Sequence, residues 1–542
     1  MMNKYGYFKY ADVAFGAKED ASYTTNEELQ EGAALTQLSV GVEPYDFASF
    51  EKGAYITSKP KLLYKGQQNL GYLSKTISDE NGLFETPISL IITFDNYYTT
   101  TGITINSKNQ ILDLEIVAYQ NENEIARKSF VAESKNQFYP IDIELANKIE
   151  IMVKKIAEPF HFFGFFNIEY GTIRLFEESN FQNATIVRNF SVLGDTLEYD
   201  TLDLSIVDTT NENYLFQKKQ PIDYIVNNDK KRIFYVNEGQ KADDVITNLS
   251  CYDEIANLED EFLGGIYELY NCKSLIDEIM EGKDIAYQVD TSVEGILIDG
   301  YIPITTRRKA LQMLLLGANI RCFKRDKLYF EPIDYSVMPL VLSENNILQN
   351  PQKTKKQGIR SVTVKSHYYL KGTEERELYH WYISTTKNVT ITFSSPMHNL
   401  RAYEVTGTDE NGNDIVSTTQ SNKVTFVKKS ANYCIVSNKS NNKIVIKGFQ
   451  YVESVEEHKK TNDIISNIGN YEDIVVDLMI MGSGYSEPIC EDLYRLYSRK
   501  NSIKFLTMEN LELGHRYNIL GENLFIKSIS QKLNGIYEVE AV

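Results

Sequence analysis

The chain has 542 residues, of which 42% are hydrophobic and 12% aromatic, so it can fill three or four folded cores and is not a disordered chain. Its 75 acidic residues outnumber its 56 basic residues, and the formal charge of −19 argues against sequence-specific nucleic-acid binding. Its apolar runs are far shorter than the roughly 20 residues that a membrane-spanning helix needs. We therefore expect a multi-domain globular protein with no membrane span.

The reactive residue types show no pattern of a catalytic or metal-binding site. Five widely spaced cysteines include no CxxC pair, so we expect reduced, mostly buried thiols rather than disulfides or a zinc site. Six histidines form no HExxH or HxH motif, and the glycine patterns of phosphate-binding loops are absent from the sequence. We therefore expect no enzyme activity, no metal and no cofactor.

The N-terminal part is predicted to be an irregular arm followed by a β-sandwich. Residues 1–43 have few periodic apolar positions and lack the apolar segment of a signal peptide, so we expect a protein made in the cytoplasm. Alternating or β-branched runs at 88–94, 102–105 and 112–119, separated by polar turns, predict strands. We assign residues 44–171 to a β-sandwich.

Residues 172–345 are predicted to form a first barrel with an α/β insertion. Strand-like alternation runs through 195–206, but its frame slips between Tyr199 and Leu202. A one-residue slip moves side chains to the other face of a sheet, so we expect a β-bulge near 200–201.

Three segments have the period and the end signals of helices. Residues 273–280 precede Gly282, and residues 305–317 combine a threonine N-cap with a glycine end. Residues 486–499 begin with a serine that we interpret as an N-cap, and Pro488 lies in the first turn, where proline is tolerated.

The remaining chain is predicted to be mostly strands. Residues 346–460 contain several alternating runs and are assigned to a second β-rich domain, and residues 461–542 are assigned to a helix and closing barrel strands. The predicted fold class is therefore mainly β with α+β parts, an N-terminal β-sandwich followed by two β-barrels with helical insertions.

Four motifs carry a resemblance to a known family. FLGGIY at 262–267 and GYIPITTRRKALQ at 300–312 are the most specific, and QKKQPI at 217–222 and ISDENG at 77–82 support them. Together they resemble the tail and baseplate hub proteins of phages and of prophage-like particles, contractile or siphophage-type, from Gram-positive bacteria. The segment around ISDENG resembles the galactose-binding-like β-sandwich that such proteins often carry before their hub-type barrels.

The resemblance implies a virion structural protein rather than an enzyme. Hub proteins of this kind typically form trimers whose two barrels per chain match a sixfold tail tube to a threefold spike. It therefore implies a homotrimer that contacts the tail tube protein, the central spike protein and other baseplate proteins in an assembled tail. Both an infectious phage and a bacteriocin-like particle fit, and a negative chain suits a lumen through which DNA slides.

The alternative function is a carbohydrate-binding adhesion protein of the tail tip that recognises a cell-surface glycan. Sandwiches of the galactose-binding type often stack sugars on aromatic rings, and Tyr97 and Tyr98 lie at a predicted strand end. They are the candidate ligand-binding residues, and the competing interpretation is that the sandwich docks onto neighbouring baseplate proteins. Trp381 is expected to anchor a core or an interface.

Overall fold

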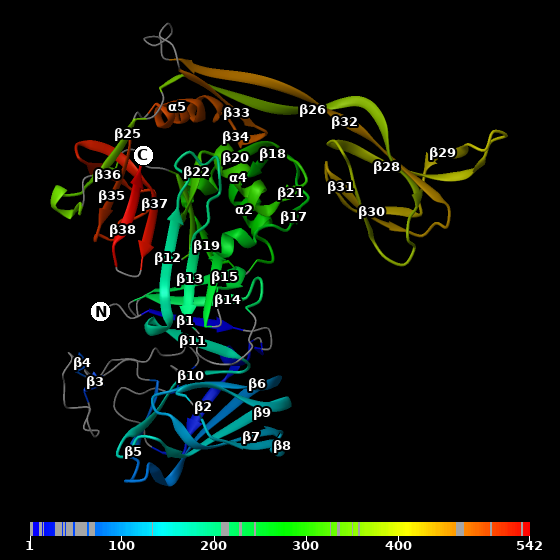
Figure 1. The fold of residues 1–542 in the computed structure, drawn as a ribbon. Helices are drawn as coiled ribbons and strands as arrows, with labels where there is room; N and C mark the ends of the chain where they lie inside the picture. Colours follow the sequence, from blue (N-terminus) through cyan, green and yellow to red (C-terminus); the bar gives the residue numbers. More distant parts are fainter. Residues whose placement is uncertain are drawn as a thin grey trace. The chain divides into compact units, whose positions relative to one another are not determined.

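The computed structural model describes residues 4–9, 13–14, 16–27, 35, 38, 47–48, 62–63, 71–132, 134–207, 216–226, 230–242, 245–283, 285–325, 327–332, 337–348, 351–355, 358–461, 471–498, 501–532 and 535–542. The chain forms two compact units, residues 1–184 with 203–251 and residues 185–202 with 252–542. Strands dominate both units (Figure 1), which confirms the predicted mainly-β fold class. The predicted domain boundaries stay predictions, and the boundary at Pro44 lies outside the described residues.

The first unit contains a sheet in which the first strand of the chain is internal. β1 (Lys4–Lys9) pairs antiparallel with β11 (Ile173–Glu177) on one side and with β14 (Pro221–Val226) on the other. Phe8 of β1 is buried and packs edge to face on Phe176, with ring centroids 5.2 Å apart. The prediction of an irregular arm is therefore wrong for residues 4–9. These residues form a strand because they pair and pack with distant parts of the chain, which their local sequence does not indicate. The sheet continues through β15 (Lys230–Lys241), β16 (Ile246–Tyr252) and β13 (Thr201–Val207).

A seven-stranded antiparallel sheet of the same unit encloses one apolar core. Its longest strand changes partner along its length: the first part of β6 pairs with β2 and the last part with β10, and register irregularities lie between Thr93 and Gly102. The strands are β2 (Ser22–Thr25), β5 (Tyr72–Ile77), β6 (Leu83–Ser107), β7 (Ile111–Gln120), β8 (Asn123–Phe130), β9 (Asn136–Ile156) and β10 (Phe162–Glu169). α1 (Ala17–Asp20) precedes β2, and β3 (Phe47–Ala48) pairs with β4 (Leu62–Leu63).

The α/β part of the second unit confirms the predicted helices of that region. α2 (Cys272–Met280) and α4 (Arg307–Gly317) bury their apolar faces in one core, and Thr306 caps α4 by accepting a hydrogen bond from the Lys309 amide at 3.2 Å. The other elements are α3 (Thr291–Glu294), β17 (Glu261–Phe262), β18 (Gly265–Asn271), β19 (Tyr287–Val289), β20 (Leu297–Ile302), β21 (Thr305–Thr306), β22 (Ile320–Lys324), β23 (Leu328–Pro332) and β34 (Ile480–Gly482).

A long two-stranded ribbon crosses the second β-rich region. β26 (Ile359–Tyr382) pairs antiparallel with β32 (Lys443–Thr461), and β33 (Glu472–Leu478) pairs parallel with the first part of β26. The sequence predicts only short strands at these positions, because the alternation of apolar residues ends long before the pairing does. The ribbon continues into β27 (Val389–Thr392), β28 (Met397–Thr408), β29 (Asp414–Gln420), β30 (Val424–Lys429) and β31 (Tyr433–Asn438).

The end of the chain forms the closing strands of the second unit. The last five residues of β12, which belong to this unit, pair with β37, and α5 packs on β26 and β32. The elements are β12 (Phe181–Asn189), β24 (Leu340–Val341), β25 (Gln352–Lys355), α5 (Ser486–Tyr497), β35 (Asn501–Thr507), β36 (Arg516–Ile519), β37 (Glu522–Lys532) and β38 (Tyr537–Ala541). Short 3-10 turns lie at Glu178–Asn180, Glu254–Asn257 and Glu344–Asn346.

Two local predictions are wrong, and a third is wrong for one of its two alternatives. The expected bulge near 200–201 is absent from this described segment, because β13 begins only at Thr201 and the buried Asp200 carboxylate accepts a hydrogen bond from the Asn189 amide at 3.3 Å. The N-cap of α5 is Tyr485 without a side-chain cap bond, so Ser486 does not cap the helix. Trp381 is 60% exposed, which excludes the core anchor, and an interface anchor stays a prediction.

We expect the ribbon to lose stability as the pH falls from about 5 to about 2. Hydrogen bonds from Arg360, His367 and Lys443 lower the pKa values of Asp473, Glu453 and Asp414, respectively. A carboxyl group whose pKa is lower in the folded state stabilises that state above its unfolded pKa, and this contribution disappears as the pH falls through the folded pKa. Hydrogen–deuterium exchange of β26 and β32 measures the loss, and constant protection down to about pH 2 would contradict it.

Candidate functional site

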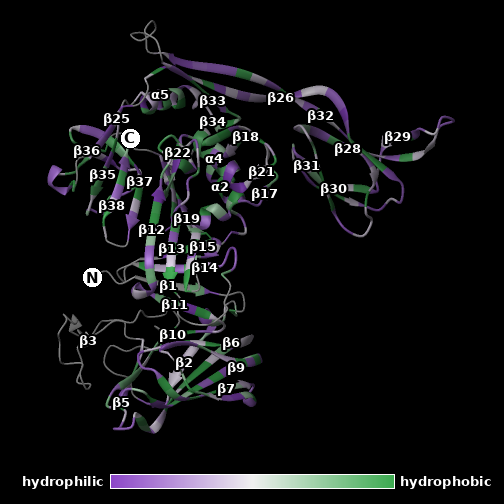
Figure 2. Ribbon diagram, in the orientation of Figure 1, coloured by the Kyte–Doolittle hydropathy of each residue, from purple (hydrophilic) through white to green (hydrophobic). Residues whose placement is uncertain are grey.

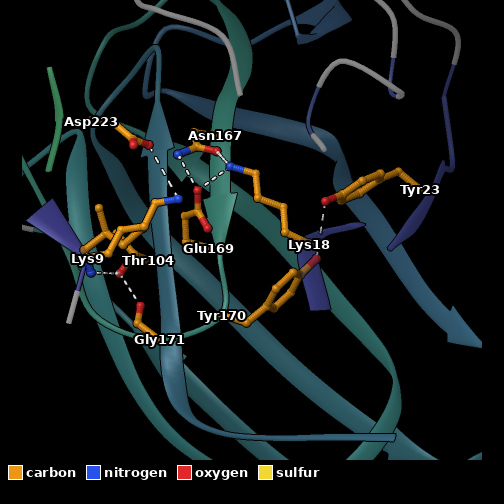
Figure 3. A network of polar contacts seen from close by, with 10 residues as sticks. Lys9, Lys18, Tyr23, Thr104, Asn167, Glu169, Tyr170, Gly171 and Asp223 are labelled. Carbon is orange, nitrogen blue, oxygen red and sulfur yellow. Dashed lines mark hydrogen bonds and ion pairs between the residues drawn. The ribbon is translucent and has the colours of Figure 1, made fainter. Parts of the chain in front are cut away.

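A buried ion network in the first unit brings together charged residues that are distant in the sequence (Figure 3). Lys18 Nζ of α1 donates a hydrogen bond to Asn167 Oδ1 at 2.7 Å and a second to the Glu169 carboxylate of β10. Asn167 Nδ2 also donates to Glu169 at 3.3 Å. The Lys18 and Glu169 side chains are only 14% and 5% exposed. Both charges are therefore withdrawn from water and depend on each other.

A second lysine and a second carboxylate extend the network to the neighbouring sheet. Lys9 of β1 lies 3.5 Å from Asp223 of β14. Burial lowers the pKa of Lys9, but the negative charges of Asp223 and Glu169 outweigh it, and the pKa is raised overall. Lys9 therefore stays charged at neutral pH, and the two lysines link α1, β1, β10 and β14 within one unit.

Neutral hydrogen bonds hold the chain segment that follows β10. Thr104 Oγ1 of β6 donates to the Gly171 carbonyl and accepts from the Ile173 amide at 3.0 Å. The hydroxyl groups of Tyr23 and Tyr170 lie 3.4 Å apart. The network thus fixes the place where the chain passes from β10 into β11. Its two lysines are paired with two carboxylates, and the Asn167 amide hydrogen-bonds to both members of one pair, so the network has the chemistry of a structural junction.

The sequence contains each residue of this junction but gives no signal for their association. Lys18 and Glu169 are 151 positions apart, and the chain has 75 acidic residues from which a partner could be drawn. The alternation that places residues 167 and 169 on one strand face is visible only once β10 is recognised.

The two tyrosines that the sequence proposes as glycan ligands have different surroundings. Tyr97 is 46% exposed, and its hydroxyl donates to Asn121 Oδ1 at 2.6 Å. Tyr98 is half-buried, packs edge to face on Phe94 with ring centroids 5.2 Å apart, and donates to the Gly16 carbonyl at 3.2 Å. Only the Tyr97 ring presents a face on which a sugar could stack, so the structure does not bring the two rings together as one platform.

The structural difference predicts different effects of removing each tyrosine ring. Tyr98→Ala should destabilise the first unit by about 2 kcal/mol, because it removes packing against Phe94 and the hydrogen bond to Gly16. Tyr97→Ala should cost less than about 1 kcal/mol, because the ring is exposed. Denaturant unfolding of both variants, monitored by the hydrogen exchange of β6, measures the two losses of stability. Equal destabilisation would contradict this assignment of the two rings.

The most specific motif of the sequence forms a docking point in the second unit. The buried Asn432 amide, next to β31, donates to the carbonyl oxygens of Leu263 at 2.7 Å and Ile302 at 2.8 Å. Ser430 Oγ donates to the Gly264 carbonyl at 3.0 Å. The backbone oxygens of the FLGG and GYIP segments therefore hold the β27–β31 region through Asn432 and Ser430. The sequence does not indicate this role for Asn432.

The described parts of the chain hold few candidates for chemistry. They contain no group of three or more His, Cys, Asp or Glu side chains that could hold a metal ion. The five cysteines are free thiols, and all except the half-buried Cys322 are buried, as predicted. No helix in these residues combines the length and the apolar character needed to cross a membrane.

No protein-family model and no curated protein matches the chain. Among solved structures, it is similar to the 43 kDa tail protein of prophage MuSo2 from Shewanella oneidensis, with 11% identity over 68% of this chain and 95% of that chain and a TM-score of 0.41. The prophage tail protein gp18 from Listeria monocytogenes shows 8% identity over 68% and 90%, with a TM-score of 0.38.

A chain in the virion of a native gene transfer agent particle is similar over 95% of this chain and 87% of its own length, with 10% identity and a TM-score of 0.27. These structural neighbours are therefore phage tail proteins and a particle component. Likenesses with TM-scores below 0.5 do not assign a function to this chain.

Proposed function

We propose that the chain is a structural hub of a phage-like tail or baseplate, forming a ring that joins the tail tube to the central spike and neighbouring baseplate proteins. The observation that supports it is the role of the family-like motifs. Residues 262–267 and 300–312 supply the start of β18, the end of β20, the cap of α4 and the carbonyl groups to which Asn432 and Ser430 donate. The resemblance therefore falls on residues that organise the second unit, as a shared architecture requires.

Free strand edges support the ring. β25 ends the order of strands in its sheet among the described residues, and all four of its residues are exposed. Unpaired backbone groups at such an edge can bind a neighbouring chain, and cyclic symmetry uses one interface repeatedly. The proposed assembly is a homotrimer that also contacts the tube, the spike and other baseplate proteins.

Particles purified from cells that produce this chain test the proposal. We expect the full-length chain in the tail fraction, by mass spectrometry, at three copies per particle. Cells with the gene deleted should yield no complete tails in electron micrographs. Complete tails without this chain would overturn the proposal.

The proposed hub performs no catalysis. A zymogram in which the purified full-length chain is run in a gel containing cell wall tests this directly. We expect no cleared band, and clearing at 62.2 kDa would replace the structural role with hydrolysis of peptidoglycan.

Glycan recognition is the second candidate, and the exposed Tyr97 ring favours it. Its hydrogen bond to Asn121 fixes a ring that is 46% exposed, and a fixed ring loses little entropy when a sugar stacks on it. Binding of the full-length chain to cell-wall polysaccharide, measured with the Tyr97→Ala variant alongside, tests this function. Binding that Tyr97→Ala abolishes would support it, and equal or absent binding of both proteins would eliminate this site.

A further inference from the structure

Two histidines of the β26 ribbon each place both ring nitrogens against carboxylate groups. His367 Nδ1 lies 2.7 Å from Glu453 Oε1 of β32, and its Nε2 lies 3.3 Å from Asp477 Oδ1 of β33. A single side chain of the middle strand therefore connects it to the strands on both of its sides.

The second histidine, thirteen positions further along the strand, also lies between two carboxylates, but one of them belongs to its own strand. His380 Nδ1 lies 3.0 Å from Glu377 Oε1 of the same strand, and its Nε2 lies 2.9 Å from Asp414 Oδ2 at the start of β29. Lys443 Nζ also contacts Asp414, at 3.1 and 2.8 Å from its two oxygens.

Only one protonation state of imidazole satisfies this geometry. A neutral imidazole has one N–H donor and one acceptor nitrogen, whereas an ionised carboxylate can only accept. A neutral ring would therefore turn a lone pair toward a carboxylate oxygen at each site. The charged ring donates at both nitrogens and forms two charge-assisted hydrogen bonds.

We propose that His367 and His380 are proton-dependent clamps of the ribbon. While charged, they hold β26 to β32, β33 and β29, and loss of a proton releases one carboxylate at each histidine and loosens the strands. This inference does not depend on the proposed tail function. It predicts a ribbon that is tighter in mildly acidic than in mildly alkaline solution.

The surroundings of His367 leave the two carboxylates as its charged partners. On the same face of β26, Tyr369 donates to Glu453 at 2.9 Å, and the ring of Tyr301 from β20 lies 5.0 Å from the Tyr369 ring. Lys365, two residues away on β26, is paired with Glu457 of β32 at 3.5 Å. Around His380 the charged groups are Glu377, Asp414 and Lys443.

The ribbon has little apolar packing to replace these contacts. After Ser366, all side chains of β26 are half-buried or exposed. Figure 2 shows hydrophilic residues along much of β26 and β32. Polar contacts between strands therefore contribute a large share of the stability there.

Hydrogen–deuterium exchange of the full-length chain at about pH 5.5 and about pH 8.5, corrected for the intrinsic rate, tests the proposal. In the wild type we expect exchange of 366–382 and 443–455 to rise on the order of tenfold at the higher pH, as expected for the loss of one charge-assisted hydrogen bond. Equal corrected protection at both pH values would overturn it.

The combined Glu453→Gln and Glu377→Gln variant provides the second test. A glutamine amide can accept from or donate to a neutral imidazole, so the ribbon should stay protected at both pH values and lose its pH difference. His398→Gln is the matched control, because His398 Nε2 faces a single carbonyl oxygen, that of Gly372, at 3.0 Å, and should keep the pH difference. A pH difference that survives in the double variant would also overturn the proposal.

Discussion

We expect Gly300→Ala to destabilise the second unit by about 4 kcal/mol. Gly300 lies in β20, in the GYIP motif, with φ +131°, a conformation that L side chains rarely adopt. A Cβ added there would overlap the backbone oxygen of Met479 and the Cα of Ile480, which precede and begin β34. Backbone atoms on a paired strand cannot move aside, so the cost of the strained φ and the cost of the steric overlap both lower the free energy of unfolding.

Hydrogen exchange of α2, α4 and β20 during denaturant titration measures this effect. Gly407→Ala is the matched control, because this strand glycine has ordinary φ and open space around its Cβ position. We expect the control to change stability by less than about 1 kcal/mol. Similar stability of the two variants would show that the motif glycine is not required for the close approach of β20 and β34.

We expect Glu169→Gln to destabilise the first unit by about 3 kcal/mol. The substitution keeps the shape of the side chain but leaves the Lys18 charge, which is 14% exposed, without its carboxylate. It also removes one of the negative charges that favour the charged form of Lys9. The cost is therefore that of a buried, uncompensated charge.

A matched pair of variants separates charge from shape. The double variant Lys18→Met with Glu169→Leu removes both charges, and we expect it to recover to within about 1 kcal/mol of the wild type. Glu124→Gln, in an exposed pair with Arg127, should cost less than about 0.5 kcal/mol. Hydrogen exchange of β10 and β1 measures all three variants, and a double variant less stable than Glu169→Gln alone would contradict the charge argument.

The elements that the sequence predicts correctly are those whose signals are local. Helix α4 begins where Thr306 accepts from the Lys309 amide, and its buried Ala310, Leu311 and Leu314 recur at helical spacing. The sequence predicts only a short strand at β26, because the second half of this strand is held by pairing with β32 rather than by an apolar face.

The candidate sites could not be predicted because they depend on long-range contacts. The junction joins Lys18 to Glu169, and the docking point joins Asn432 to Leu263 and Ile302. Nothing in the local sequence of a lysine or an asparagine distinguishes a buried partner from a solvated one. Motif resemblance located FLGG and GYIP, but only the structure shows what their carbonyl groups bind.

We propose that three copies of this chain form a ring. Light scattering of the purified full-length protein at several concentrations tests it most directly. We predict a mass of three times 62.2 kDa that persists on dilution. A mass of 62.2 kDa at every concentration would contradict a self-assembling ring.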